Sequence, residues 1–313
     1  MTDTSNEVVL AYDLGGTKMI AAAIDGRGNI LDLQKELVKK DQGMNVVLDQ
    51  LIQLAQPILQ KYPQIQKVAM ASAGPLDPGR GELLDPTNLV TVGKSWGVVP
   101  IAQILSDGLK LPVQLENDAA AAVLSNHWVG EGKGTDNLLM LTLGTGLGVG
   151  VIANGQLVRA GRHLHPEGGH IILNCSDKTA LCGCGNYGCA EAYLSGVGFC
   201  TRYAKSIGED YVKGQEVMRR AEAGETAALN AFTEYSEMMA QAIASFVVLF
   251  APEKVVFAGG FSASHHYWLK ATEVRLEQLL ARRRSGHDLV PQLEVAQLNE
   301  HMVVLGAARI AMQ

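Results

Sequence analysis

One histidine and three cysteines are gathered in a glycine-rich part of the sequence. His170 precedes Cys182, Cys184 and Cys189, and the cysteines lie within the stretch LCGCGNYGC. One imidazole nitrogen and three thiolates form a closed tetrahedral set of the kind that holds structural Zn²⁺. Clustered free thiols would oxidise readily, so metal binding explains the pattern better. We therefore predict a zinc site that fastens this loop, which has little apolar material of its own.

Glycines follow an apolar stretch of the chain at two places. DLGGTK contains Gly15 and Gly16, and LGTGLGVG contains Gly144 and Gly146. Without a Cβ atom, glycine lets the backbone turn tightly and bring its N–H groups against phosphate oxygens. One such turn alone is best explained as a plain hairpin, but two of them, each between strands, favour phosphate binding. Further donors to phosphate would be Thr17, Lys18 and Thr145.

The better-known phosphate-binding patterns fit neither turn. The P-loop pattern G-x-x-x-x-G-K-[ST] does not occur in the sequence. The dinucleotide fingerprint needs a helix after its glycines, whereas GTGLGVG runs into VIANGQLV, which has the composition of a strand. The two turns therefore indicate neither of these nucleotide-binding classes.

Two aspartates stand beside predicted strand ends. Asp13 precedes the first glycine turn, where it would either hydrogen-bond the amides of the turn or hold Mg²⁺ at a phosphate. Asp118 follows the strand PVQLEN and, with Asn117, would either cap the helix DAAAAVLSNHW or act on a ligand at the strand end. A carboxylate at that place could accept the proton of an attacking hydroxyl, a step that phosphoryl transfer needs.

Two glutamates flank the predicted zinc ligands. Glu167 precedes His170 by three residues, and Glu191 follows Cys189 by two. Surface charge would explain either glutamate alone, but a zinc loop would bring both carboxylates toward one place. Two acceptors held together in this way suit the hydroxyl groups of a sugar.

The segments around these residues alternate between strand and helix patterns. VVLAYDLGGTKMIAAAID predicts two strands joined by the first glycine turn, and ILDLQKEL predicts a third strand. Apolar residues at helical spacing predict a helix from about Met44 to Lys61. QKVAMASAG and EKVVFAGGF predict buried strands, and AALNAFTEYSEMMAQAIASFVVLF and HMVVLGAARIAM predict helices.

The strand–glycine turn–strand pattern occurs twice, about 130 residues apart, which indicates a duplicated architecture. NLLMLTLGTGLGVGVIANGQLV repeats the opening pattern, and Asn154 and Gly155 predict a tight hairpin before one more strand. No low-complexity linker separates the halves. We therefore expect two domains that pass directly into each other, with a cleft between them.

Composition and charge exclude several classes of function. The chain has 313 residues, of which 47% are hydrophobic and 19% charged, which is the balance of a globular protein. Its net charge of −6 opposes nucleic-acid binding. The sequence has no signal-peptide pattern, and its longest nearly apolar stretch is too short to span a bilayer. Five cysteines without an export signal argue against disulfides. We expect a cytoplasmic protein that binds neither nucleic acid nor membrane.

In combination, these motifs are similar to those of the ROK family, named for repressors, open reading frames and kinases. The resemblance covers nearly the whole chain and rests on DLGGTK, GPLDP, PTNL, ENDA, LGTGLGVG, HPEGGH, CGCGNYGCAE, FAGGF and LGAA, in that order. It implies an α/β protein of the actin-like, ribonuclease-H-like fold, with two α/β domains and an interdomain cleft. We predict a small domain of residues 1–117 with the C-terminal helix 301–313, and a large domain of residues 118–300 that carries the zinc loop.

The resemblance also implies a reaction and a role for each motif. Family kinases transfer the γ-phosphate of ATP, with Mg²⁺, to a sugar hydroxyl, often the 6-hydroxyl of a hexose, and are commonly dimers. By this resemblance Asp118 is the general base, the turns at residues 15–18 and 144–146 bind phosphates, and His170 contacts the sugar as well as zinc. The remaining residues for the sugar are Asn88, Asn117, Glu167 and Glu191, and those for the adenosine are Gly259 and Gly260.

Two departures from the family pattern bear on the sugar. SAGPLD carries Ser72 and Ala73 where the family usually has Gly and Pro, and HPEGGH has His-Pro where many glucokinases have Ala-Gly. Some fructokinases and mannose-type kinases resemble this sequence at the second point. We predict a glucose kinase, with an N-acylhexosamine kinase, for N-acetylglucosamine or N-acetylmannosamine, or a fructose or mannose kinase as the alternative.

Two non-catalytic functions are weighed against the kinase. Family repressors carry an N-terminal helix-turn-helix, for which the few residues before the first strand leave no room, and the negative charge also opposes DNA binding. A sugar-sensing regulator without catalysis would be expected to have lost a phosphate turn or the base, and this sequence retains Asp118 and both turns.

Overall fold

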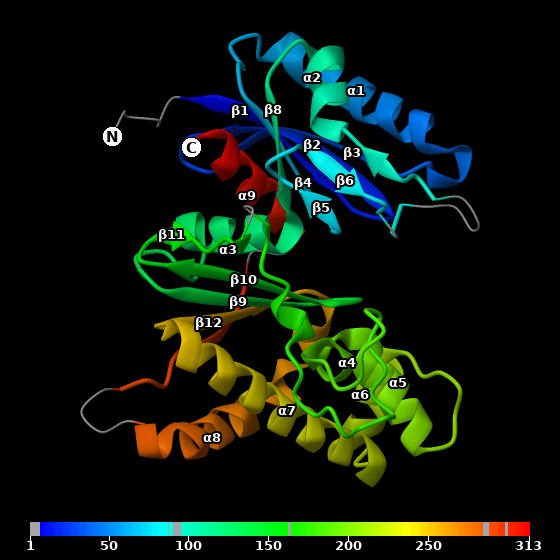
Figure 1. The fold of residues 1–313 in the computed structure, drawn as a ribbon, viewed down its shortest axis with the longest axis vertical. Helices are drawn as coiled ribbons and strands as arrows, with labels where there is room; N and C mark the ends of the chain where they lie inside the picture. The colour runs from blue at the N-terminus through cyan, green and yellow to red at the C-terminus, as the bar shows by residue number, and fades with distance from the viewer. Residues whose placement is uncertain (1–6, 87, 90–94, 162–163, 284–287, 298–299) are drawn as a thin grey trace. The chain divides into compact units, whose positions relative to one another are not determined.

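The computed structural model describes residues 7–86, 88–89, 95–161, 164–283, 288–297 and 300–313. The chain forms two compact α/β units, each built on a five-stranded sheet (Figure 1). Unit 1 contains residues 1–133, 157–166 and 300–313, and unit 2 contains residues 134–156 and 167–299. The chain thus crosses between the units several times.

The sheet of unit 1 has the strand order β3-β2-β1-β4-β8. Strands β1, β2 and β3 form an antiparallel meander, whereas β4 is parallel to β1 and β8 is parallel to β4. Strands β1, β2 and β4 are almost wholly buried, which explains why their sequences are continuous apolar runs rather than alternating ones. The bounds are β1 Val8–Leu14, β2 Lys18–Asp25, β3 Ile30–Leu37, β4 Val68–Ser72 and β8 Val113–Asn117.

Helices cover both faces of this sheet (Figure 1). Helices α1 (Met44–Lys61) and α2 (Ile101–Leu109) pack together on one face, and α3 (Asp118–Val129) and α9 (Met302–Ala311) pack together on the other. Helices α3 and α9 touch closely at Gly306, where a Cβ atom would lie 1.8 Å from the carbonyl oxygen of Ala121. A small sheet of β5 (Leu76–Asp77), β6 (Glu82–Leu84) and β7 (Val98–Val99) completes the unit.

The sheet of unit 2 repeats the order of the first one as β11-β10-β9-β12-β13. Its first two strands in sequence are antiparallel, its fourth strand is parallel to the first, and its fifth is parallel to the fourth. The predicted duplication is therefore confirmed at the level of sheet topology. The bounds are β9 Leu138–Leu143, β10 Leu147–Ala153, β11 Gln156–Leu157, β12 Lys254–Ala258 and β13 Gln292–Val295.

A helical layer packs around the long helix α7 of unit 2. Aromatic side chains, among them Phe199, Phe232, Tyr235 and Phe261, contact one another at its centre. The helices are α4 Ala190–Leu194, α5 Gly196–Ser206, α6 Gly214–Glu222, α7 Thr226–Phe250 and α8 Leu269–Leu280. Single 3₁₀ turns are η1 Lys40–Gln42, η3 Gly168–His170 and η5 Ala281–Arg283, and η4 Gly260–Tyr267 is a longer 3₁₀ helix.

The two compact units differ in their limits from the domains predicted from the sequence. The predicted boundary before Asp118 would place α3 in the second domain, but α3 packs on the sheet of unit 1 and against α9, and that unit runs on to Lys133. The segment 157–166 also belongs to unit 1. Helix α9 belongs to unit 1 as well.

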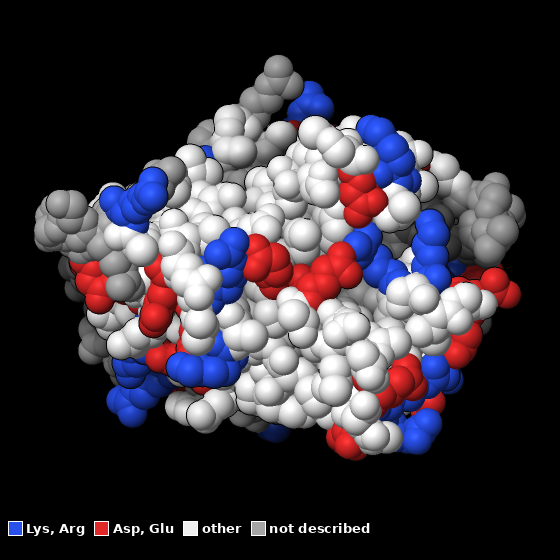
Figure 2. Space-filling model, turned by 90° about the horizontal axis from the view of Figure 1, so that it is seen from below, with Lys and Arg blue, Asp and Glu red and all other residues white. Residues whose placement is uncertain are grey.

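The surface charge is mixed, and ion pairs account for much of it. Figure 2 shows a face on which acidic and basic side chains lie beside one another among uncharged residues. Pairs such as Arg275 with Glu237, at 2.7 Å, are partly exposed, and pairs of this kind contribute little to stability. Across the described ranges, no helix is both long enough and apolar enough to cross a bilayer.

Candidate functional site

The carboxyl ends of three parallel strands meet at one edge of the unit 1 sheet. Leu14 on β1 is paired with Ser72 on β4, which is paired in turn with Asn117 on β8. The Ser72 hydroxyl donates to the Leu14 carbonyl oxygen at 3.3 Å, which ties two of these strand ends together. In open α/β sheets this edge is where ligands bind. Asp13 and Asp118, which adjoin Leu14 and Asn117, are therefore carried to it.

Asn117 and Asp118 begin helix α3 with a well-formed cap. The Asn117 Oδ1 accepts hydrogen bonds from the N–H groups of Ala119, at 2.8 Å, and Ala120, at 3.3 Å. The Asp118 Oδ1 also accepts from the Ala119 N–H at 2.8 Å. The capping interpretation is therefore correct for Asn117, and Asp118 is held in a fixed orientation by the same turn.

The charges of Asp118 and Lys18 both act on Asp13 beside the first glycine turn. Burial, the largest cause, and the charge of Asp118 raise the pKa of Asp13, the charge of Lys18 lowers it, and the resulting pKa is about 7. Burial also raises the pKa of Asp118, against the lowering effect of the backbone N–H groups bonded to it. A raised pKa makes each carboxylate a stronger base and a stronger ligand for a hard cation. This donor set fits Mg²⁺, which prefers carboxylate oxygens.

The first glycine turn is held tightly against a neighbouring loop. The Gly15 N–H donates to the Lys18 carbonyl oxygen at 3.0 Å. A Cβ atom on Gly16 would lie 2.8 Å from the Asn88 carbonyl oxygen, so only glycine fits there. The Asn88 Oδ1 is buried and has no hydrogen-bond partner among the described residues, as expected of a group that awaits a ligand. The Lys18 Nζ pairs with the Glu300 Oε2 at 3.4 Å.

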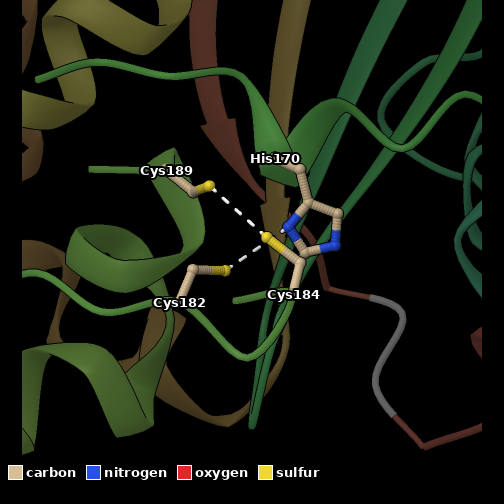
Figure 3. Close-up of side chains that lie close together, drawn as sticks. All are labelled: His170, Cys182, Cys184 and Cys189. Atoms are coloured by element: carbon tan, nitrogen blue, oxygen red, sulfur yellow. Dashed lines mark hydrogen bonds between the residues drawn. The ribbon is translucent and has the colours of Figure 1, made fainter. Parts of the chain in front are cut away.

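In unit 2, the four residues predicted to bind metal converge (Figure 3). The imidazole and the three thiols point toward one another, and their ligand atoms all lie within 4.8 Å of one another. The His170 Nδ1 is 3.5 Å from the Cys182 Sγ, and the Cys184 and Cys189 sulfurs are 3.7 Å apart. Bonds of about 2.0–2.3 Å to a tetrahedral ion would span such separations, so the set fits Zn²⁺.

Glu191 connects this cluster to the second glycine turn. Its Oε2 accepts the Leu147 N–H at 3.1 Å, and its Oε1 accepts the Cys182 thiol at 3.3 Å. A Cβ atom on Gly146 would lie 2.6 Å from the same Oε2, so the glycine is needed to admit the carboxylate. Glu191 therefore has structural partners that the sequence did not indicate, in addition to its predicted place at a sugar.

Glu167 lies one residue before the 3₁₀ turn η3, which ends at His170. The His170 N–H donates to the Glu167 carbonyl oxygen at 3.0 Å, and this bond closes the turn. A Cβ atom on Gly169 would lie 2.2 Å from the Leu147 carbonyl oxygen, so η3 packs directly on β10. The η3 turn is thus fixed at the start of β10. The common sugar site predicted for Glu167, Glu191 and the unit 1 residues stays a prediction.

The second glycine turn opens onto a cavity of about 430 Å³ in unit 2. Gly144 and Thr145 line it from one side, and Gly260, at the start of η4, lines it from another. The adjoining Gly259 has a φ of +88° and packs against the Leu143 backbone, so it shapes the turn rather than the lining. Residues on or beside α5, α6 and η4 form the rest of the lining, namely Gly196, Val197, Cys200, Tyr211, Lys213, Gly214, Gln215, Met218, Phe261 and Ser264.

Sequence reasoning missed those cavity residues, because ordinary side chains that line a pocket form no motif. Their only signal is position: α5 follows the cysteine loop after the short helix α4 and begins at Gly196, whose N–H donates to the Gly144 carbonyl oxygen at 2.8 Å. The predicted site residues thus fall into two groups, one at the strand ends of unit 1 and one around the cysteine loop and the cavity of unit 2.

Comparison with known proteins places these features in a family. The sequence profile of the ROK family matches residues 9–313. A glucokinase from Streptomyces coelicolor is 28% identical over 97% of this chain and 97% of its own. An N-acetyl-D-glucosamine kinase from Pectobacterium atrosepticum is 30% identical over 80% of this chain and 83% of its own.

Two solved structures are similar over almost their whole length. A ROK hexokinase from Thermus thermophilus has a TM-score of 0.86 at 30% identity and covers 97% of this chain and 98% of its own. A ROK family glucokinase from Streptomyces griseus, solved in complex with glucose and AMPPNP, has a TM-score of 0.74 at 27% identity, covering 98% of this chain and 99% of its own. The predicted actin-like, ribonuclease-H-like fold with two α/β domains is confirmed.

Proposed function

This chain belongs to the ROK family, and from that premise we propose that it is an ATP-dependent hexose kinase that acts on glucose to form glucose 6-phosphate. The observation that carries the proposal is the placement of Asp118. Its carboxylate is oriented by the first turn of α3, has a raised pKa, and interacts with Asp13 beside a glycine turn. A base next to a site for phosphate and Mg²⁺ is what phosphoryl transfer to a hydroxyl needs.

In the proposed reaction, the Asp118 carboxylate takes the proton of the sugar hydroxyl as that oxygen attacks the γ-phosphorus of ATP. A bond forms between the hydroxyl oxygen and phosphorus, the bond from phosphorus to the β–γ bridging oxygen breaks, and ADP leaves. Mg²⁺, when bound, would neutralise developing charge on the phosphates. Asp13 would hold it directly or through water, and the amides of the two glycine turns would contact phosphate oxygens.

The sugar is proposed to bind through Asn88, Asn117, Glu167, His170 and Glu191. The Asn88 Oδ1 offers a buried acceptor that lacks a partner among the described residues, and a sugar hydroxyl would supply one. Zn²⁺ would be held by His170, Cys182, Cys184 and Cys189 and would fix the loop that carries the carboxylates. The adenosine of ATP is proposed to occupy the cavity at Gly144, Thr145 and Gly260.

N-Acetylglucosamine is a second candidate substrate, because the Pectobacterium relative that is 30% identical carries that name. N-Acetylmannosamine remains an alternative as the other N-acylhexosamine, and fructose and mannose remain alternatives through the HPEGGH segment. A sugar-sensing regulator is the non-catalytic alternative. We also propose a cytoplasmic homodimer without nucleic-acid or membrane partners, by family membership and by the net charge of −6.

The test is a coupled ADP-release assay with ATP and Mg²⁺ on a panel of sugars. The panel contains glucose, mannose, fructose, N-acetylglucosamine, N-acetylmannosamine and allose. We expect the highest kcat/KM with glucose. A higher value with another sugar would replace glucose as the substrate but keep the kinase. No turnover with any of them, in protein that contains zinc, would favour either a sugar outside the panel or a sensor without catalysis.

A further inference from the structure

A buried carboxylate lies directly before Asn117 and Asp118 and is paired with an arginine from a distant part of the chain. Glu116 is 1% exposed, and its Oε2 lies 2.5 Å from a guanidinium nitrogen of Arg159. Arg159 follows β11, in the segment 157–166 that returns to unit 1. Neither residue has a role in the function proposed above.

The second oxygen of Glu116 holds the backbone of the strand end. Its Oε1 accepts the Asn117 N–H at 2.9 Å. Asn117 then accepts the first N–H groups of α3 through its own side chain. An unbroken series of contacts therefore runs from the Arg159 guanidinium through Glu116 to the cap of the helix that begins with Asp118.

Glu116 depends on the arginine, because a carboxylate buried in a protein needs a charged or hydrogen-bonding partner. Without Arg159, Glu116 would either take up a proton or turn toward water. Either change would weaken or remove the acceptor that holds the Asn117 N–H. The strand end would then be free to shift, and displacements of about 1 Å at a reacting group can slow a reaction about 100-fold.

We propose that Arg159 is a positioning residue, which through Glu116 fixes the strand end that presents Asn117 and Asp118 to the sugar. This inference rests on the proposed kinase function and adds to it a residue that touches neither substrate nor nucleotide. The always-charged guanidinium suits the role, because it compensates the buried charge of Glu116, whose Oε2 accepts no hydrogen bond within the described part of the chain. Arg159 also anchors the segment that leads to Glu167.

The test uses the full-length protein with the variants R159M, R159K, E116Q and R159M/E116Q. The readouts are kcat, the KM values for sugar and for ATP, zinc content and melting temperature. Arg80→Met is the matched control, because the Arg80–Glu82 pair of the same unit is long, at 3.6 Å, and the Arg80 side chain is 72% exposed.

We expect R159M to lower kcat about 10- to 100-fold and to raise the KM for sugar, with an unchanged KM for ATP and unchanged zinc content. R159K should recover part of the loss. The double variant should exceed R159M in kcat, because the E116Q substitution removes the charge that needs compensation while the amide oxygen it introduces can still accept the Asn117 N–H. Arg80→Met should match the wild type.

Unchanged kcat and sugar KM in R159M would overturn the inference. So would a loss that R159K and the double variant fail to relieve, since that is the behaviour of a merely structural residue. Should R159M fail to fold, R159K and the double variant, compared with E116Q, carry the same test.

If the wild type binds a sugar without turnover, the kinase proposal fails, and calorimetry decides the inference: weaker sugar binding by R159M supports it and equal affinity overturns it. A wild type that neither binds nor phosphorylates any sugar would overturn both.

Discussion

The carboxyl groups of Asp13 and Asp118 interact electrostatically in unit 1, and this interaction adds to burial in raising the pKa of Asp13 to about 7. Asp13 lies on β1 and Asp118 opens α3, and the strand pairing through β4 brings both to one edge of the sheet. At neutral pH, Asp13 is therefore divided between its charged and neutral forms. A divalent cation bound there would favour the charged form.

This shift predicts how stability depends on pH in the absence of Mg²⁺ and nucleotide. The pKa of Asp13 is about 7 in the folded protein against an ordinary value of 3.8, so between these values the folded state holds a proton that the unfolded state has released. The contribution of Asp13 to the free energy of unfolding therefore falls as pH rises from about 4 to about 7 and stays low above it.

Asp13→Asn should remove that dependence. The free energy of unfolding of the variant minus that of the wild type should increase by on the order of 2 kcal/mol from pH 5 to pH 8. Urea denaturation at both pH values measures this difference. The exposed residue Asp49 provides the control variant, Asp49→Asn. A difference between Asp13→Asn and wild type that is the same at both pH values would contradict the shifted pKa.

Two neighbouring glycines at the cavity should respond to substitution in opposite ways. A Cβ atom on Gly260 meets no atom within 4 Å, and Gly260 lines the cavity. Gly260→Leu should therefore fold normally and raise the KM for ATP at least about tenfold, because its side chain occupies ligand space, at a cost of about 1–3 kcal/mol in binding. Steady-state kinetics at saturating sugar measure this. An unchanged KM for ATP would place the nucleotide elsewhere.

Gly259 is constrained by the backbone instead. Its φ is +88°, and a Cβ atom would lie 2.4 Å from the Leu143 carbonyl oxygen. Gly259→Ala should lower the free energy of unfolding by about 2 kcal/mol or more, because alanine is strained at this φ and the clash is with backbone. Thermal unfolding compares the two variants. A stable Gly259→Ala together with an unstable Gly260→Leu would contradict the assignment of Gly259 to the constrained turn and of Gly260 to the cavity lining.

From the proposed metal site we predict the effect of a ligand substitution on both zinc content and stability. Cys184→Ser should reduce zinc from about one ion per chain to a small fraction of that, and lower the melting temperature, because a structural ion contributes its binding free energy to folding. Cys175→Ser is the control, since Cys175 is exposed and lies outside the four-residue cluster. Mass spectrometry of metal content and calorimetric melting are the measurements. Equal zinc content in Cys184→Ser and wild type would show that the ligand set is wrong.

The sequence predicts most of the sheet architecture and the clustering of His170 with the three cysteines, because both depend on local patterns. Buried runs around Asp13 and Thr142 predict central strands, the glycines after them mark turns, and the spacing of the cysteines restricts them to one loop. Asn154 and Gly155 also form the predicted hairpin turn, with φ values of 52° and 71°. Each of these patterns reports on neighbours within a few residues.

Features that depend on distant contacts could not be predicted in the same way. The sequence of α3 does not indicate which sheet the helix packs on. Its close contact with α9 depends on Gly306, which leaves room for the Ala121 carbonyl and lies far from α3 in the sequence. The pairing of Glu116 with Arg159 and the approach of Glu191 to Leu147 likewise join segments that only the fold brings together. Charged residues in a motif predict that a site exists, but their partners are fixed by tertiary structure.

The most direct test of the kinase assignment is the effect of Asp118→Asn on turnover and on sugar binding. With the sugar that gives the highest kcat/KM, the variant should lose about 100- to 10,000-fold in kcat, because it has no general base. Its sugar affinity by calorimetry and its melting temperature should stay close to wild type, since the asparagine Oδ1 can still accept the Ala119 N–H. Turnover near the wild-type value would contradict the assignment of Asp118 as the base and, with it, the account of the site.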